Sequence, residues 1–367
     1  MIYLDNGATS FCKPAEVYRA VCKAMHTCAN PGRGGYDAAM EAGRVVFACR
    51  EEAALLFDCR PEQVVFTSNC THALNIALRT LVAPGTKVVI SGFEHNAVTR
   101  TLHLLGADIR IAGHRLFDWD NVLDEFEKEL RGGAQVAVFT HVSNVFGYIL
   151  PVEELAELCR RYSVPFVIDA AQSAGMLPVS LKKLEADFIA MPGHKGLLGP
   201  QGTGILLCNR IPKPLLAGGT GSESMRQDMP EDIPDRGEAG TMNVPGIAGL
   251  GAGIRFVRNK GVEAIALREQ QAAKQCAELL RKMGLRVFSG EHQSGTVSFV
   301  PDMDCEEMAD KLGSRGIAVR AGLHCAPLAH KSAGTLETGT VRISFGHDAQ
   351  YRQIMALKQE IERIMLL

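Results

Sequence analysis

Short apolar runs alternate with longer amphipathic stretches between about residues 60 and 210. The runs are continuous and rich in β-branched residues, which is typical of strands that are buried on both faces. The stretches between them carry apolar residues at helical spacing. Strands that alternate with helices predict a mostly parallel sheet covered by helices on both sides. The predicted strands cover residues 64–67, 87–91, 109–112, 136–141, 165–169, 187–191 and 204–208.

Helices are predicted both between these strands and before them. Segment 14–28 begins with Pro14, which suits a first helical turn, and its apolar residues recur every four positions. Residues 210–246 are rich in Gly and Pro and predict irregular structure. The helices between the strands are predicted at residues 71–82, 95–105, 119–131, 152–162 and 175–184.

The last hundred residues have a different pattern, in which a long helix is followed by short strands. A chain of 367 residues is long enough for two cores. We therefore expect a large α/β domain of residues 14–256, and a small α+β domain of residues 1–13 and 257–367. The predicted elements of the small domain are helices at 261–283, 304–315 and 348–366 and strands at 286–289, 296–300, 317–319 and 341–345.

Composition and charge exclude several classes of protein. Apolar residues make up 46% and charged residues 22% of the chain, as in ordinary soluble enzymes. The net charge of −2 and the lack of a Lys/Arg block give no sign of nucleic-acid binding. No apolar run has the length of a membrane span, and the first residues do not resemble an export signal, so we expect a cytoplasmic protein. The 11 cysteines include no CxxC pair, which predicts reduced thiols and no metal site.

The strongest chemical signal is a lysine and an aspartate that follow two neighbouring strands. Lys195 lies on a Gly-flanked turn after the strand at 187–191, where a lysine beside a pocket can form a Schiff base. Asp169 ends the preceding strand, at the sheet edge where open α/β proteins bind ligands. A Schiff-base lysine and a carboxylate for a pyridine nitrogen are what pyridoxal phosphate requires of a protein. The pair therefore predicts a site for this cofactor.

Three further strand ends carry polar groups. Thr71 opens a helix, whose free amides form an anion site, although the residue is also an ordinary helix cap. His95 follows the next strand and can lie against an aromatic ring, or be a surface histidine. Asn144 follows a third strand and supplies an amide. Together with Asp169 and Lys195, these residues predict one cofactor site built from five strand ends.

Two residues in the last fifty suggest a nucleophile and a carboxylate receptor. Cys325 lies on a Gly/Pro-bounded loop beside His324, and a nearby imidazolium favours the thiolate, although a buried structural thiol is the alternative. Arg342 lies in an apolar strand, so it needs a carboxylate, either of a substrate or of a structural ion pair. The glycine-rich stretch 249–253 follows no strand and lacks the third glycine of a dinucleotide-binding motif, which excludes that type of site.

Taken together, these motifs resemble the class V aminotransferase family of pyridoxal phosphate enzymes, in the branch of cysteine desulfurases and selenocysteine lyases. The resemblance extends over nearly the whole chain and implies a homodimer of the fold-type I class, with a large α/β domain and a smaller α+β domain. It rests on segments 3–9, 94–96, 169–172, 193–195 and 240–243, together with Thr71, Asn144, the loop of Cys325 and Arg342.

The resemblance also implies a role for individual residues. Lys195 would hold pyridoxal phosphate, Asp169 would pair with its ring nitrogen, and His95 would stack on the ring. Thr241 would reach the phosphate from a second subunit. Asn144 and Arg342 would bind the substrate, while Lys195, His95 and Cys325 would be catalytic. The full implied cofactor set is Cys70, Thr71, His95, Asn144, Asp169, Ala171, Gln172, His194, Lys195 and Thr241.

The reaction implied is removal of sulfur from L-cysteine, which gives L-alanine and a persulfide on Cys325 that a sulfur-acceptor protein could receive. Selenocysteine lyase, another class V lyase or aminotransferase, and a non-catalytic sulfur carrier are the alternatives. The chain departs from the family at four positions. Pro192 stands where a hydroxyl residue is common, His72 where glutamate is common, Tyr36 where histidine is frequent and Gly7 where alanine is common.

Overall fold

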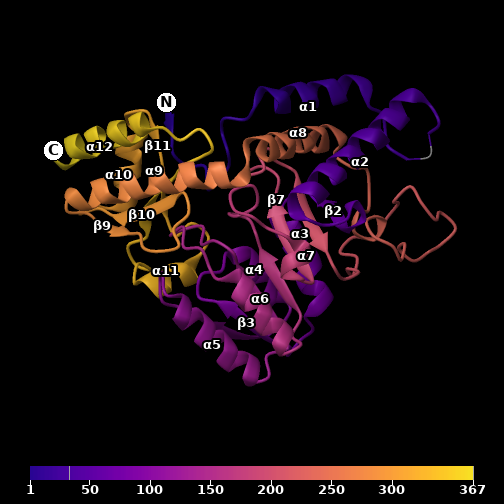
Figure 1. Cartoon of the computed structure of the whole chain (residues 1–367), viewed down its shortest axis with the longest axis horizontal. Helices are drawn as coiled ribbons and strands as arrows, with labels where there is room; N and C mark the ends of the chain where they lie inside the picture. The colour runs from indigo at the N-terminus through magenta and orange to yellow at the C-terminus, as the bar shows by residue number, and fades with distance from the viewer. Residues whose placement is uncertain (33, 367) are drawn as a thin grey trace.

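A seven-stranded sheet forms the centre of the larger part of the molecule in the computed structural model, which describes residues 1–32 and 34–366 (Figure 1). Only β8 runs antiparallel to its two neighbours, while the other adjacent pairs are parallel. The predicted mostly parallel sheet is thus confirmed. In spatial order its strands are β2 (Val64–Thr67), β8 (Gly204–Cys208), β7 (Phe188–Pro192), β6 (Phe166–Asp169), β5 (Val136–Thr140), β3 (Lys87–Ser91) and β4 (Asp108–Ala112).

Helices cover both faces of this sheet because successive strand residues point to opposite sides. Val88 and Ile90 pack in a cluster with α3 (Cys70–Leu81) and α4 (Asn96–Leu104). Val89 belongs to a second cluster on the other face. The helices of that face are α5 (Trp119–Arg131), α6 (Val152–Arg161), α7 (Leu181–Leu184), α2 (Asp37–Phe57) and α8 (Val244–Lys260).

Two long helices, α2 and α8, were not predicted from the sequence. α8 lies between α2 and α1 (Ala15–Thr27), and glycines on α8 allow the close approach. A Cβ at Gly249 would lie 2.6 Å from the Val21 side chain, and one at Gly251 would lie 3.2 Å from the Cys49 Cβ. The glycine-rich stretch is therefore a helix-packing surface. The loop before it contains only the short turn η2 (Asp235–Gly237), and η1 (Pro61–Gln63) precedes β2.

The predicted helix at 175–184 is wrong over most of its length. Gly175 has a φ of +82°, and a Cβ there would collide with the carbonyl of Gly196, next to Lys195. Pro178 then interrupts the segment. Only α7 remains helical. The segment is a tight turn because it packs against the lysine-bearing turn.

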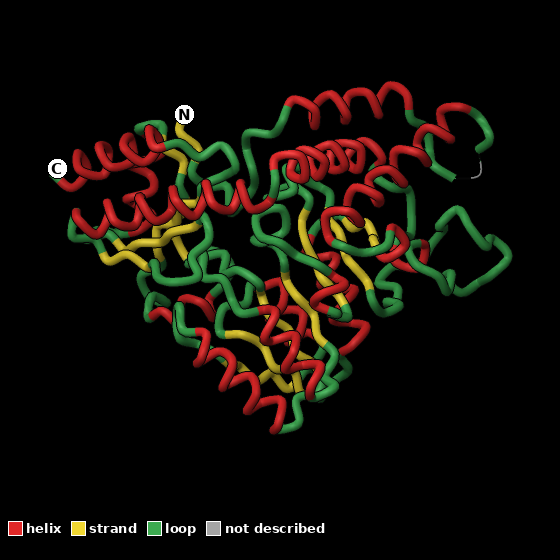
Figure 2. Tube along the Cα trace, viewed as in Figure 1, coloured by secondary structure: helices red, strands yellow, loops and turns green. Residues whose placement is uncertain are grey.

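The smaller part of the molecule contains a second sheet with its own apolar core. Apart from this sheet, β1 (Ile2–Tyr3) pairs in parallel with β11 (Ile317–Ala318), which places the start of the chain in the smaller part. Figure 2 shows that both chain ends lie at this end of the molecule. The predicted boundary at residues 256 and 257 falls inside α8, and the domain division stays a prediction. The sheet consists of β12 (Arg320–Gly322), β13 (Thr340–Ser344), β10 (Thr296–Val300) and β9 (Arg286–Phe288), and the helices are α9 (Val262–Lys282), α10 (Cys305–Ser314), α11 (Pro327–Ala333) and α12 (Tyr351–Met365).

Candidate active site

One pocket collects the side chains that follow β2, β3, β5, β6 and β7. These strands are mutually parallel, so their carboxyl ends meet at one edge of the sheet. The structure therefore brings all five strand-end residues of the sequence analysis together. The pocket is lined by Asn69, Cys70, Thr71, His95, Ala97, Thr140, Val142, Asn144, Asp169, Ala171, Gln172, Pro192, His194 and Lys195.

Asp169 is almost fully buried at the end of β6, and its carboxylate is held through one oxygen. The backbone N–H of Ala171 donates to Oδ1 at 2.9 Å, and the thiol of Cys70 donates to the same atom at 3.5 Å. Among the described residues no hydrogen bond reaches Oδ2. One carboxylate oxygen thus remains free to accept a hydrogen bond from a group in the pocket.

Lys195 lies on the turn after β7, which closes through a hydrogen bond from the N–H of Leu198 to its carbonyl. Burial lowers the pKa of Lys195, and the Arg342 guanidinium lowers it further. The neighbouring Gly193 and Gly196 have no room for a side chain, because a Cβ would meet Thr203 or the carbonyl of Ala174. The amine is thus held in a tight turn and loses its proton more easily than an exposed lysine.

The start of α3 presents backbone amides to the same pocket. Asn69 caps this helix by accepting a hydrogen bond from the N–H of His72 at 2.8 Å. Cys70 and Thr71 form the first turn and line the pocket. Unpaired N–H groups and the helix dipole favour an anion at such a position.

His95 caps α4 with Nδ1, which accepts a hydrogen bond from the N–H of Ala97 at 3.0 Å. The ring proton is therefore on Nε2. Burial lowers the pKa of His95, and although the Asp169 carboxylate opposes this shift, the net direction is downward. A neutral, oriented imidazole thus forms one wall of the pocket.

The N-terminal segment contacts two residues of the pocket lining. Gln172 donates from Nε2 to the carbonyl of Gly7 at 3.0 Å. The imidazole of His194 contacts the hydroxyl of Thr9 at 3.0 Å. Burial lowers the pKa of His194 to about 4, with Lys195 adding to the shift, so this imidazole is neutral.

Cys325 is exposed and lies just outside the pocket lining, on the turn between β12 and α11. Two hydrogen bonds hold the backbone of this turn to Asn144, which lines the pocket, and to Asn96, which lies between the lining residues His95 and Ala97. The side-chain amide of Asn144 donates to the carbonyl of His324, and the N–H of Asn96 donates to the carbonyl of Cys325, each at 2.8 Å. The turn is thus fixed beside the pocket while the thiol stays accessible.

The expected imidazolium beside Cys325 is wrong. Burial lowers the pKa of His324 to about 3, and the Arg342 guanidinium contributes to this shift. The ring stacks on His330, with centroids 5.8 Å apart. A neutral His324 supplies no positive charge to the neighbouring thiol.

Arg342 is buried on β13 and does not line the pocket, but it contacts a residue that does. Its Nη1 donates to the Asn144 carbonyl at 3.0 Å, and its Nη2 pairs with Asp5 at 2.6 Å. Asp5 also pairs with Arg320 at 3.0 Å. Within the described chain, Nε of Arg342 is buried without a hydrogen-bond partner. One edge of the guanidinium is therefore in an ion pair and another is unsatisfied.

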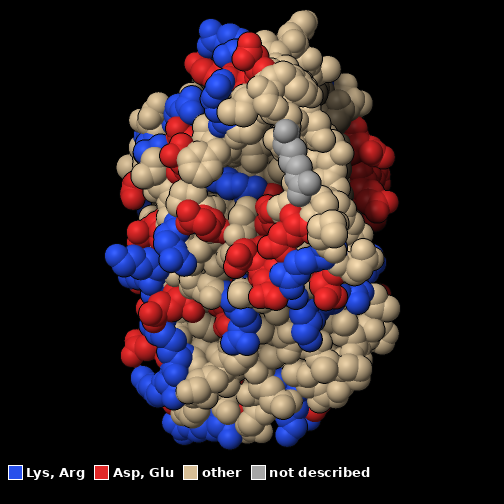
Figure 3. Space-filling model, turned by 90° about the vertical axis from the view of Figure 1, so that its right-hand side faces the viewer, with Lys and Arg blue, Asp and Glu red and all other residues tan. Residues whose placement is uncertain are grey.

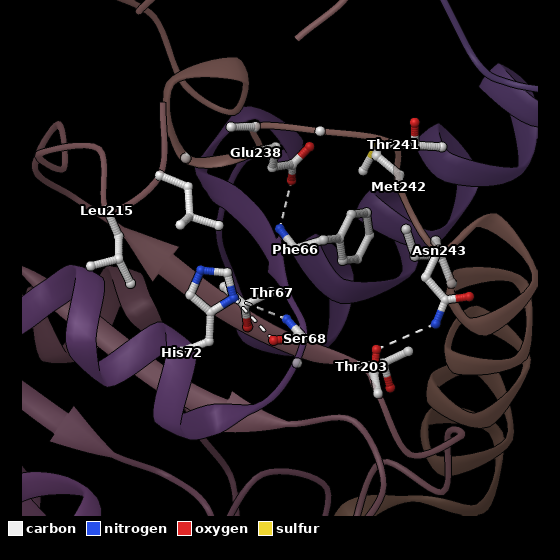
Figure 4. A pocket seen from close by; sticks show the side chains of 17 residues that line it. Phe66, Thr67, Ser68, His72, Thr203, Leu215, Glu238, Thr241, Met242 and Asn243 are labelled. Atoms are coloured by element: carbon white, nitrogen blue, oxygen red, sulfur yellow. Dashed lines mark hydrogen bonds between the residues drawn. The ribbon is translucent and has the colours of Figure 1, made fainter. Parts of the chain in front are cut away.

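Thr241 lies away from the Lys195 pocket. It lines a second pocket with Phe66, His72 and Thr203, shown in Figure 4. In that pocket Nδ1 of His72 contacts both the backbone N–H and the hydroxyl of Ser68, at 3.3 and 3.1 Å. Within one subunit, therefore, Thr241 is separate from the other predicted cofactor residues.

Comparison with known proteins shows to which family the chain belongs. The profile of the family described as "Aminotransferase class-V" matches residues 2–357. The chain belongs to the class V aminotransferase family. A probable cysteine desulfurase of Methanothermobacter thermautotrophicus is 32% identical, across 99% of this chain and 94% of the relative. A probable cysteine desulfurase of Pyrococcus abyssi is 34% identical, across 94% and 89% of the two chains.

Solved structures of cysteine desulfurases share the fold. A cysteine desulfurase from Thermococcus onnurineus superposes with a TM-score of 0.91 at 33% identity, and the alignment covers 99% of this chain and 94% of that one. A cysteine desulfurase from Escherichia coli superposes with a TM-score of 0.88 at 25% identity, covering 100% and 95%. The chain therefore has the fold-type I architecture along its whole length.

Two acidic residues of this class V site were not assigned from the sequence. Glu94 is fully buried beside the pocket, where Oε1 accepts hydrogen bonds from the Ser91 hydroxyl and the N–H of Thr140. Burial raises its pKa to about 8. Asp5 is the carboxylate shared by the two arginines. Both lie in segments that carry the family resemblance, 3–9 and 94–96, but only a tertiary contact distinguishes them from surface acids.

Other classes of site have less support in the described part of the chain. No group of three or more His, Cys, Asp or Glu side chains there could hold a metal ion. No helix in the same residues is long and apolar enough to cross a membrane. All 11 cysteines are free thiols.

Proposed function

We propose that this protein is a cysteine desulfurase that uses pyridoxal phosphate to transfer sulfur from L-cysteine to Cys325. The observation that carries the proposal is the pocket that contains both Lys195 and Asp169, with the turn of an exposed cysteine fixed beside it. The names of the class V relatives support the same activity.

The residues present fit the cofactor. Lys195 offers an amine whose pKa is lowered, Oδ2 of Asp169 is free for a protonated ring nitrogen, and His95 offers a neutral ring. The amides of Cys70 and Thr71, with His194, would take the phosphate. Gln172 and Ala171 would lie along the ring. When bound, pyridoxal phosphate withdraws electrons from the substrate's α-carbon.

Asn144 and Arg342 would orient the substrate. Nη2 of Arg342 is occupied by Asp5 and its Nε is buried without a partner, so we assign the remaining hydrogen-bonding capacity of this guanidinium to the substrate carboxylate. Asp5 would keep the guanidinium in that position. Lys195, once released from the cofactor, is the group in the pocket that moves protons to and from the substrate.

In the sulfur transfer step the attacking group is the thiol of Cys325. Its thiolate attacks the sulfur of the substrate, the S–S bond forms, and the bond between Cβ and sulfur breaks. The bonding electron pair stays on the substrate carbon skeleton, which gains a proton and leaves as L-alanine. Cysteine plus the enzyme thiol thus gives alanine plus the enzyme persulfide, and no outside oxidant is required. A thiol or an acceptor protein then removes the persulfide sulfur.

The active enzyme is proposed to be a homodimer in which Thr241 completes the partner's site. Large apolar side chains are exposed along α1 and α2, on the part of the molecule that Figure 3 turns toward the viewer. They are Tyr18, Met25, Met40, Phe47 and Leu55. Uncharged surface lies between the Lys/Arg and Asp/Glu groups of that face, which suits an interface.

The test is incubation of the cofactor-loaded protein with L-cysteine and a thiol reductant, with alanine and sulfide measured together. Equal yields are expected. Cys325→Ala should bind cofactor but release little alanine, whereas Cys12→Ala, a second exposed thiol, should act like the parent. Alanine from selenocysteine alone would favour a selenocysteine lyase, alanine at the parental rate from Cys325→Ala would remove the acceptor role, and no product from either substrate would favour a sulfur carrier.

A further inference from the structure

The buried thiol of Cys70 contacts the carboxylate of Asp169, which in the proposed function pairs with the ring nitrogen of the cofactor. Cys70 is the first residue of α3, and its Sγ lies 3.5 Å from Oδ1 of Asp169. Burial raises the pKa of Cys70 well above its usual value, and the Asp169 charge raises it further. The thiol therefore keeps its proton and acts as the donor in this contact.

The other donor to Asp169 fixes the same oxygen. The N–H of Ala171 lies 2.9 Å from Oδ1, so both hydrogen bonds converge on one side of the carboxylate. A carboxylate held by two donors on one oxygen has little freedom to rotate about its terminal bond. Among the described residues the second oxygen has no partner.

We infer that Cys70 is a positioning residue whose side chain orients Asp169 so that Oδ2 faces the ring nitrogen of the bound cofactor. This inference rests on the proposed function for the identity of the cofactor. It goes beyond the role implied for Cys70 by the family resemblance, which uses only the backbone amide. The same residue thereby connects the anion site at the start of α3 to the carboxylate at the end of β6.

The position of Cys70 makes the contact specific. Cys208 lies in the same apolar cluster, but its thiol contacts the carbonyl of Leu206 and does not line the pocket. Replacing either cysteine with alanine removes the same atoms from the same core. Cys208→Ala is therefore the matched control for the loss of packing.

The first experiment is a double-mutant cycle on the cofactor-free protein, with unfolding followed in urea. Cys70→Ala should lower stability more in the parent than in an Asp169→Ala background, because the hydrogen bond exists only in the parent. Cys208→Ala should cost the same in both backgrounds. Equal costs of Cys70→Ala in the two backgrounds would overturn the inference, whatever the protein's activity.

The second experiment measures pyridoxal phosphate affinity and turnover. Cys70→Ala should weaken cofactor binding by five- to tenfold and lower kcat more than it raises KM for L-cysteine. Cys70→Ser keeps a donor and should restore most of both losses, while Cys208→Ala should stay within twofold of the parent. If Cys70→Ser behaves like Cys70→Ala, the donor role is wrong. If the parent itself does not bind pyridoxal phosphate, the proposed function fails, while the cycle in the cofactor-free protein still decides the Cys70–Asp169 contact.

Discussion

The side-chain amide of Asn144 donates a hydrogen bond to the backbone carbonyl of His324, with 2.8 Å between Nδ2 and the oxygen. His324 and Cys325 both have left-handed backbone conformations, with φ of 50° and 56°. Such conformations are unfavourable for residues other than glycine and persist where surrounding contacts hold them. The hydrogen bond from Asn144 is one of those contacts, so it fixes the turn that presents the thiol.

Asn144→Ala should release this turn. We expect iodoacetamide to alkylate Cys325 several times faster in the variant, as measured by peptide mass spectrometry, because the turn opens more often. Sulfur release should fall at least tenfold. Asn209→Ala removes a similar amide-to-carbonyl bond far from the site, from Nδ2 to Ala186 at 2.9 Å, and serves as the control. Unchanged alkylation in Asn144→Ala would show that the turn is held without this bond.

Lys195 should be the residue that carries the cofactor. Protein loaded with pyridoxal phosphate should be yellow, and Lys195→Ala should lack that colour. Borohydride reduction should add the cofactor mass to the peptide that contains Lys195. Lys13 is the competing amine, since burial lowers its pKa to about 8. Cofactor mass on the Lys13 peptide would contradict the assignment.

Glu94 should make the protein less stable as the pH rises. Its pKa in the folded state is about 8, against an ordinary value of 4.5. Between these values the folded protein keeps a proton that the unfolded chain has lost, so a higher pH favours unfolding. The slope is at most about 1.4 kcal/mol per pH unit, and it ends near the folded pKa.

The measurement for Glu94 is urea unfolding of the cofactor-free protein and of Glu94→Gln from pH 6.5 to 9. The buried histidines hardly affect the pH dependence of stability in that range. Their pKa values are lowered in the folded state and ordinarily 6.5, so both values lie at or below its lower limit. The stability difference between Glu94→Gln and the parent should grow up to about pH 8 and then stay constant. A difference that does not change with pH would mean that Glu94 titrates normally.

Thr241 should act in the site of the partner subunit. Thr241→Ala alone should weaken binding of pyridoxal phosphate about tenfold. A mixed dimer of Lys195→Ala and Thr241→Ala chains then contains one intact site, made of Lys195 from one chain and Thr241 from the other. Purified mixed dimers should have about half of the parental activity, because one of their two sites is intact. No restoration in verified mixed dimers, or a fully active monomer, would place Thr241 outside the site.

The strands were predictable because each is a short apolar run between polar turns. β2, β3 and β8 have the predicted bounds, and the helices between the strands mostly agree within one residue. α8 was not predicted, because its glycines disfavour an isolated helix. They are compatible with a helix only where α1, α2 and the turn near Leu197 pack directly against the backbone.

Sequence by itself therefore determined the parallel sheet and the polar groups that its strand ends bring to one edge, because parallel strands must end together. Only the tertiary structure decided how those groups are charged and oriented. Burial makes His324 neutral despite its place beside Cys325, and raises the pKa of Glu94. Asp5 forms an ion pair with Arg342, although more than three hundred residues separate them in the sequence. The Cys70 thiol, which follows a different strand, donates a hydrogen bond to Asp169. Such pairings depend on distance and solvent exclusion, which spacing along the chain does not encode.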